Sequence, residues 1–200
     1  MNIVDRIKKI LLQPKMEWEI IAAETTTTYE LYRNYIMPLA AIGPVASIIG
    51  MSVIGISMPF AGTFRIPITS SFGSAVVQYV FGLIGVYILA LIIDFLAPKF
   101  TGEKNVNQAL KLAAYSYTAG WLSGIFIAIP ALSALMITGL YGLYLLYTGI
   151  PILMKAPKEK SLGYTIAVVI AAIIIFMIIG WISGAFISYP SPHMYLPKVS

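Results

Sequence analysis

The stretch Phe81-Gly-Leu-Ile-Gly-Val-Tyr-Ile-Leu-Ala-Leu-Ile-Ile93 decides the fold, because it is apolar along its whole length and ends at Asp94. A second uncharged run, 112–129, begins directly after Lys111. Apolar segments of about 20 residues are typical of helices that cross a lipid bilayer. Both runs therefore predict membrane spans, and each has an ionisable residue at its border.

The overall composition indicates the same class of protein. Of the 200 residues, 59% are hydrophobic and only 10% are charged, and the mean hydropathy is +0.87. A water-soluble globule of this length needs more polar surface than this chain provides. The sequence therefore predicts an integral membrane protein. Because the chain has no cysteine, disulfides and thiolate metal sites are excluded.

We predict an all-α, polytopic integral membrane protein, a bundle of five transmembrane helices preceded by an N-terminal amphipathic interfacial helix. Pro130 leaves almost no loop between the third and fourth spans, so these two should form an antiparallel hairpin. The predicted organisation is a cytoplasmic or interfacial segment 1–34, a membrane domain 35–188 with spans at 35–56, 72–96, 108–129, 131–153 and 163–187, and a C-terminal tail 189–200.

The N-terminal helix has two interpretations. Asn2 can cap it and Pro14 ends it. Its apolar residues share one face and its charged residues the other, which suits a helix lying on the membrane surface with its basic face toward anionic headgroups. The same pattern suits a helix packed against the base of the bundle.

The distribution of positive charge predicts the orientation in the membrane. Of the thirteen Lys and Arg residues, only Arg65 and Lys198 fall on the side opposite the N-terminal segment. Cytoplasmic loops carry an excess of Lys and Arg. We therefore expect a multi-pass inner-membrane protein with a cytoplasmic N-terminus and a C-terminus outside.

In this topology Asp94 and Lys111 lie at similar depth near the cytoplasmic boundary. A charge inside hydrocarbon costs roughly 2.5–3.5 kcal/mol at a helix centre and less near an interface. One interpretation is an ion pair that sets the register of the second and third spans. The alternative is that Asp94 binds an ion or proton in a candidate polar site within the membrane, formed by Asp94, Lys111, Gln78, Tyr115, Tyr141 and Tyr144. The tyrosines could equally form hydrogen bonds between helices.

The remaining basic residues suggest a cytoplasmic interaction face and offer no catalytic chemistry. The chain has one histidine, His193, and contains no P-loop, no His-Glu-x-x-His pair and no Gly-x-Ser-x-Gly elbow. We expect no enzyme activity, no cofactor and no metal.

The basic residues lie scattered beside apolar spans, and this distribution also argues against a nucleic-acid partner. The candidate face comprises Lys8, Lys9, Lys99, Lys104, Lys155, Lys158 and Lys160.

Several ordered polar motifs resemble the Yip domain family, named after Ypt-interacting proteins, and its prokaryotic branch in particular. The similarity covers most of residues 30–175. It rests on Ile92-Ile-Asp94-Phe-Leu-Ala-Pro98, Gly102-Glu-Lys-Asn105, Gln108-Ala-Leu-Lys111-Leu-Ala-Ala-Tyr-Ser-Tyr117, Tyr141-Gly-Leu-Tyr-Leu-Leu-Tyr147 and Met154-Lys-Ala-Pro-Lys-Glu-Lys160.

The resemblance implies five spans and a cytoplasmic N-terminus. For eukaryotic members it implies a role in membrane traffic, with binding to prenylated Rab-type GTPases and oligomerisation with relatives. Glu30-Leu-Tyr32-Arg-Asn departs from their Asp-Leu-Tyr-Gly-Pro signature. For prokaryotic members it implies an inner-membrane protein.

Two functions follow as hypotheses. The first is a non-catalytic membrane-organising or adaptor protein whose basic cytoplasmic face binds membrane lipids or a protein partner, with homo-oligomerisation as a further option. The second is a small transporter or channel that uses Asp94 as its ion- or proton-binding carboxylate.

Overall fold

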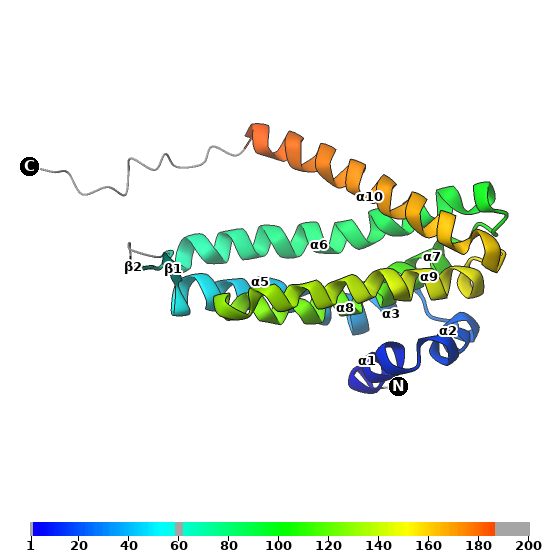
Figure 1. Ribbon diagram of the computed structural model, residues 1–200, viewed down its shortest axis with the longest axis horizontal. Coiled ribbons are helices and arrows are strands. Elements are labelled where there is room, and N and C mark those ends of the chain that lie inside the picture. Colours follow the sequence, from blue (N-terminus) through cyan, green and yellow to red (C-terminus); the bar gives the residue numbers. More distant parts are fainter. Residues whose placement is uncertain (1, 59–61, 187–200) are drawn as a thin grey trace, which may run out of the picture.

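The computed structural model of the protein describes residues 2–58 and 62–186. Within them the chain is almost entirely helical, which confirms the predicted fold class. Two long helices, α6 and α10, and several shorter helical segments run along the long axis of the molecule (Figure 1). The first part of the chain comprises α1 (Ile3–Leu12), α2 (Pro14–Ala23), α3 (Thr28–Leu31), η1 (Tyr32–Ile36), α4 (Met37–Ala40), α5 (Ile42–Ile48) and η2 (Ile49–Ile54).

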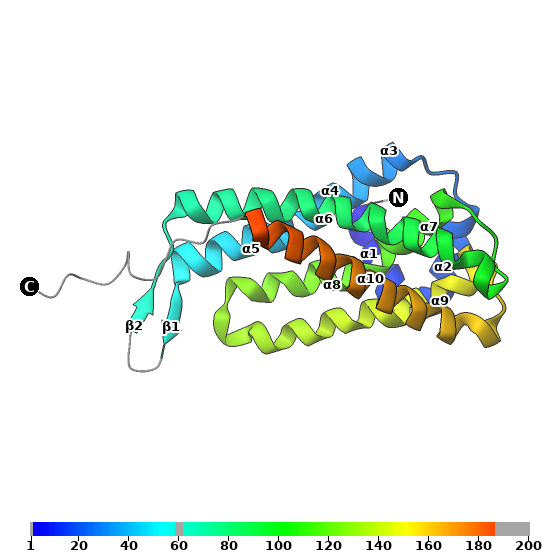
Figure 2. The ribbon, with the colours of Figure 1, turned by 90° about the horizontal axis from the view of Figure 1, so that it is seen from above.

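A small β-ribbon separates these helices from the rest. Strand β1 (Ile56–Met58) pairs antiparallel with β2 (Gly62–Phe64). It lies at the end of the molecule opposite the N-terminal helices (Figure 2). The helices that follow are α6 (Ile68–Leu96), η3 (Ala97–Phe100), α7 (Val106–Ser116), α8 (Thr118–Ser123), η4 (Gly124–Ala128), η5 (Pro130–Leu140), α9 (Tyr141–Leu153) and α10 (Lys158–Phe186).

Four helical stretches of the described chain are long and apolar enough to cross a membrane. They are Thr28–Ile54, Ile68–Phe100, Ala131–Leu153 and Lys158–Ile178. Large apolar side chains such as Phe72 on α6 and Ile170 on α10 are more than half exposed on the outside of the bundle. Such a surface is unfavourable in water but matches the hydrocarbon of a bilayer.

The segment predicted as the third span differs from the other four. It consists of α7, α8 and η4 and is not among the four stretches of the described chain that are long and apolar enough to cross a membrane, so the count of five spans stays a prediction. Every residue from 109 to 116 is buried, because α7 contacts α3, α6, α8 and α9. This segment is therefore the centre of the bundle, and the long helices surround it.

The N-terminal helices cover one end of the bundle. In Figure 1, α2 lies toward the end that carries the α6–α7 and α9–α10 connections, and α1 lies further from that end, where its Leu11 carbonyl accepts a hydrogen bond from Tyr141 at the start of α9. The side chains of Ile10, Trp18 and Ile21 are completely buried there. The structure agrees with the second interpretation of the N-terminal helix, because this helix packs against the bundle.

Candidate functional site

A buried ionic cluster attaches α1 and α2 to the bundle. The Arg6 Nη1 atom lies 2.5 Å from Glu17 Oε1, and Arg6 Nη2 donates to Glu24 Oε1. The side chain of Glu17 is only 3% exposed. Removing an ion from water costs several kcal/mol, and a hydrogen-bonded partner of opposite charge offsets part of that cost. Because separating α1 from α2 inside the bundle would leave a buried charge without its partner, the salt bridges favour this arrangement of the two helices over other packed ones.

The guanidinium keeps its charge in this position. Burial by itself lowers the pKa of Arg6, but its hydrogen bond to Glu24 and the negative charges of Glu24 and Glu17 raise the pKa above its ordinary value. The Arg6 Cζ atom also lies 5.7 Å from the centre of the Tyr115 ring, a cation–π distance. Arg6 thus joins α1 to both α2 and α7.

Aromatic side chains fill the space around the cluster. The Tyr115 ring lies 4.5 Å from Tyr35 and 6.2 Å from Trp18, between ring centres. The Trp18 indole N–H donates to Thr148 Oγ1 at 3.2 Å. A side chain on Gly149 would meet Leu112 and Trp18, because its Cβ would lie 2.5 Å and 2.7 Å from their atoms. Glycine at 149 therefore allows α2 to approach α9 closely.

Lys111 lies in the same region, and its hydrogen-bond partners differ from the partner that the sequence predicts. Its Nζ atom donates to the backbone carbonyls of Ile21 at 3.0 Å and Glu24 at 2.5 Å. These carbonyls lie at the C-terminal end of α2, where orphan acceptors and the helix dipole favour a positive charge. Within the described residues no ion pair joins Lys111 to Asp94. The predicted pair is therefore wrong, because Lys111 points toward α2.

Two neighbours of Lys111 contribute to the same attachment. The Asn107 side chain donates to the Thr26 carbonyl, and the Gln108 side chain donates to the Ala22 carbonyl, both at 3.0 Å. The first turns of α7 therefore hold the end of α2 and the linker after it through three side chains. The motif that starts at Gln108 positions the N-terminal helices.

Asp94 has a different environment. Its Oδ1 atom is buried and has no hydrogen-bond partner among the described residues. Tyr164 stands nearby, but its hydroxyl donates to the carbonyl of Ile93. An unpartnered buried carboxylate oxygen is uncommon and calls for a specific explanation.

The other members of the predicted polar site are dispersed. Gln78 lies on the exposed side of α6. Tyr115 lines a polar cavity of about 270 Å³ together with Arg6 and Glu24. The Tyr141 hydroxyl donates to the Leu11 carbonyl at 2.9 Å. The exposed ring of Tyr144 is tilted against that of Tyr141, with 5.3 Å between the ring centres. Tyr141 and Tyr144 thus lie together on the exposed side of α9, whereas Tyr115 lies beside the ionic cluster.

The predicted basic face lies at the end of the molecule that carries α1 and α2. The α6–α7 and α9–α10 connections are joined there, since the Glu103 backbone N–H donates to the Met154 carbonyl at 2.8 Å and Lys155 Nζ lies 2.7 Å from Glu103 Oε2. Lys99 and Lys104 flank the exposed ring of Phe95. All seven residues of this face are exposed, namely Lys8, Lys9, Lys99, Lys104, Lys155, Lys158 and Lys160.

Sequence reasoning missed Arg6, Glu17, Glu24 and Trp18. A signal was present, because Glu17 stands directly before Trp18 in a short apolar helix and Arg6 precedes the Pro14 break. Opposite charges on two short helices joined by one residue can meet. Within the part of the chain that the structure describes, no three acidic or histidine side chains gather as a metal site would require.

Comparison with known proteins places most of the chain in one family. A family model described as the Yip1 domain matches residues 8–179. The inner membrane protein YohC of Escherichia coli strain K12 is 26% identical over 156 residues, which are 76% of this chain and 80% of that protein. YohC of E. coli O6:H1 strain CFT073 matches equally well. No solved structure matches this chain.

Proposed function

From the premise that this chain belongs to the Yip1 domain family, we propose that it organises the inner membrane as a non-catalytic adaptor. Its basic cytoplasmic face binds anionic lipid headgroups and, through the same lysines, a protein partner. Inner-membrane localisation is supported by the similarity to YohC, an inner membrane protein. The orientation, with the N-terminus in the cytoplasm, is supported by the distribution of Lys and Arg.

We base this proposal on contacts that hold the three segments carrying these lysines in fixed positions. The ionic cluster and Lys111 hold α1 and α2, and Glu103 links the two connections beside them. Lysines held on a common scaffold attract anionic surfaces, at about 1 kcal/mol for each Lys near the membrane. Their side chains are exposed to the surroundings of the protein, including Lys155, which is paired with Glu103.

Charge reversal tests the adaptor function. In cross-linking pull-downs from membranes, the double variant Lys158→Glu and Lys160→Glu should lose its partners, and native mass spectrometry should detect less bound anionic lipid. Arg65→Glu, at the opposite end, is the matched control. Because the chain has no cysteine, single introduced cysteines can verify that both variants keep their topology. An unchanged set of partners and lipids in the double variant would contradict the proposal.

A second candidate is a small transporter or channel, and the unpartnered Oδ1 atom of Asp94 favours it. A buried carboxylate without a partner can take up a proton or a cation. If this is its function, proteoliposomes containing the protein conduct ions or protons under a gradient and Asp94→Asn abolishes the flux. Absence of flux from the unmodified protein under proton and sodium gradients would exclude this candidate.

A further inference from the structure

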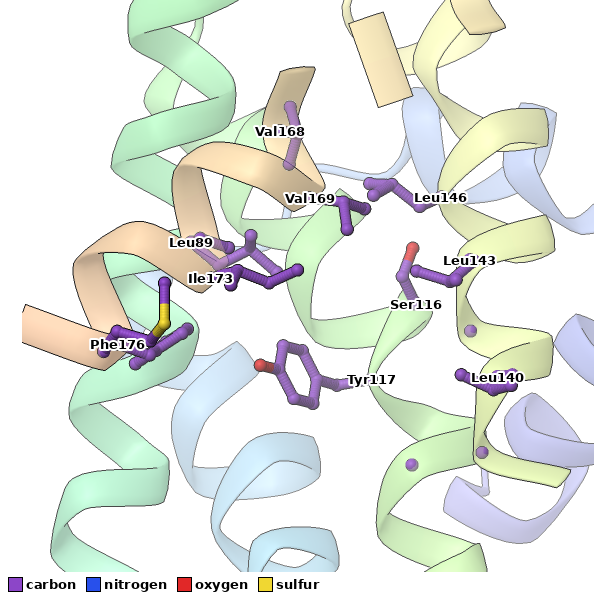
Figure 3. A pocket seen from close by; sticks show the side chains of 15 residues that line it. Leu89, Ser116, Tyr117, Leu140, Leu143, Leu146, Val168, Val169, Ile173 and Phe176 are labelled. Carbon is purple, nitrogen blue, oxygen red and sulfur yellow. The ribbon is translucent and has the colours of Figure 1, made fainter. Parts of the chain in front are cut away.

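A large apolar cavity lies between the helices, apart from the ionic cluster and the basic face. Its volume is about 580 Å³, and α6, α7, α9 and α10 all contribute to its walls. Figure 3 shows Leu143 and Leu146 of α9 facing Val169 and Ile173 of α10 across it. The size is typical of a ligand pocket, which usually occupies about 300–1,000 Å³.

The cavity contains a hydrogen-bonding group that nothing in the described chain satisfies. Ser116 is 5% exposed, and its Oγ atom is buried without a hydrogen-bond partner. In Figure 3, Ser116 and the ring of Tyr117 lie at the wall of the cavity, with Ser116 beside α9. A buried hydroxyl without a partner is costly. The site therefore fits a mostly apolar molecule with one hydrogen-bond acceptor.

The depth of the cavity in the membrane indicates that such a molecule would come from the lipid bilayer. Ser116 lies five residues beyond Lys111 on α7, and Leu89 lies five residues before Asp94 on α6, so both lie about 8 Å inside the predicted membrane boundary at 1.5 Å per residue. This is the zone just below lipid headgroups. In Figures 1 and 2, α10 runs obliquely to α6 and α9 and diverges from them toward its C-terminal end.

We propose that this cavity holds one acyl chain of a bilayer phospholipid, with the Ser116 hydroxyl donating to the ester carbonyl at the head of that chain. Its volume of about 580 Å³ lies within the range of pockets that hold small apolar ligands. The phospholipid enters from the surrounding membrane beside α10. Its binding does not depend on the function proposed for the basic face.

Photolabelling of the full chain tests this inference. The protein is reconstituted in phosphatidylethanolamine vesicles containing a trace of a phospholipid with a photoreactive group in one acyl chain. We expect labelled residues on α7, α9 and the inner face of α10. Ala172→Phe, which fills the cavity from α10, should lose the labels inside it. Ile170→Phe adds the same ring on the exposed side of α10, where Ile170 is 52% exposed, and should keep them.

A second variant covers the case in which Ala172→Phe does not fold. Ser116→Ala removes a hydroxyl that has no partner in the protein, so its thermal unfolding should match wild type. It should retain less phospholipid during detergent washing, as measured by native mass spectrometry.

Three results would overturn the inference. The first is labelling confined to the outer surface of the wild-type protein. The second is labelling of the cavity by a photoreactive free fatty acid but not by the phospholipid. The third is a cross-link between two copies of the chain through residues that line the cavity.

Discussion

Lys111→Met tests how the N-terminal helices are attached. The substitution keeps an unbranched side chain and removes the ammonium that donates to the carbonyls of Ile21 and Glu24. Each hydrogen bond from a charged donor contributes about 1.5–3 kcal/mol. The cost of burying the ammonium offsets part of the sum of the two bonds. We therefore expect the free energy of docking of α1 and α2 to fall by about 3 kcal/mol.

Hydrogen–deuterium exchange measures this change directly. Because 1.4 kcal/mol corresponds to a factor of ten, a loss of about 3 kcal/mol raises the equilibrium constant for undocking about 100-fold. Amides of α1 and α2 that exchange through undocking should then exchange faster by the same factor. The amides of α6 should keep their wild-type rates. The experiment is performed on the full chain in lipid nanodiscs.

Asp94→Asn is the matched control, because the structure contains no ion pair between Asp94 and Lys111. This variant should leave the exchange of α1 and α2 unchanged. Equal acceleration in both variants would mean that the two side chains act as a pair after all. Wild-type exchange in Lys111→Met would refute the assignment of Lys111 as the attachment point of α2.

Two further substitutions test packing and surface charge. Gly149→Ala should lower the melting temperature in a thermal unfolding experiment by the equivalent of about 1–3 kcal/mol, because the new methyl group would overlap Trp18. Gly82→Ala, with open space around it, should melt at or above the wild-type temperature, and equal melting of the two variants would contradict the close packing at 149. Glu103→Gln removes the salt bridge to Lys155, whose partners are both 65% exposed, and should change stability by less than about 1 kcal/mol in chemical unfolding. A larger loss of stability would mean that this salt bridge contributes more than an exposed ion pair usually does.

The contrast between Asp94 and Lys111 illustrates what a sequence can predict. Both residues stand at the ends of apolar runs, so their approximate depth follows from hydropathy. Their partners do not, because a partner depends on how each helix is rotated about its axis and on which elements pack against it. Lys111 faces α2, which is an element outside the neighbouring span.

The ionic cluster shows the same limit. Arg6 and Glu17 are separated by Pro14, and charged residues on short helices usually remain in water. Their burial requires α1, α2 and α7 to converge, as the contact between Arg6 and Tyr115 demonstrates. A local pattern describes one helix at a time and contains no information on that convergence.

The sequence by itself determined the membrane class, the helical fold and the family, because hydropathy and ordered motifs are properties that accumulate along the chain. Only the tertiary structure decided that residues 109–116 of α7 form the buried centre of the bundle, that α1 and α2 are held by Arg6 and Lys111, and that an apolar cavity lies beside Ser116. The physical reason is that burial and hydrogen-bond partners arise from packing between segments far apart in the chain, which no single stretch of residues specifies.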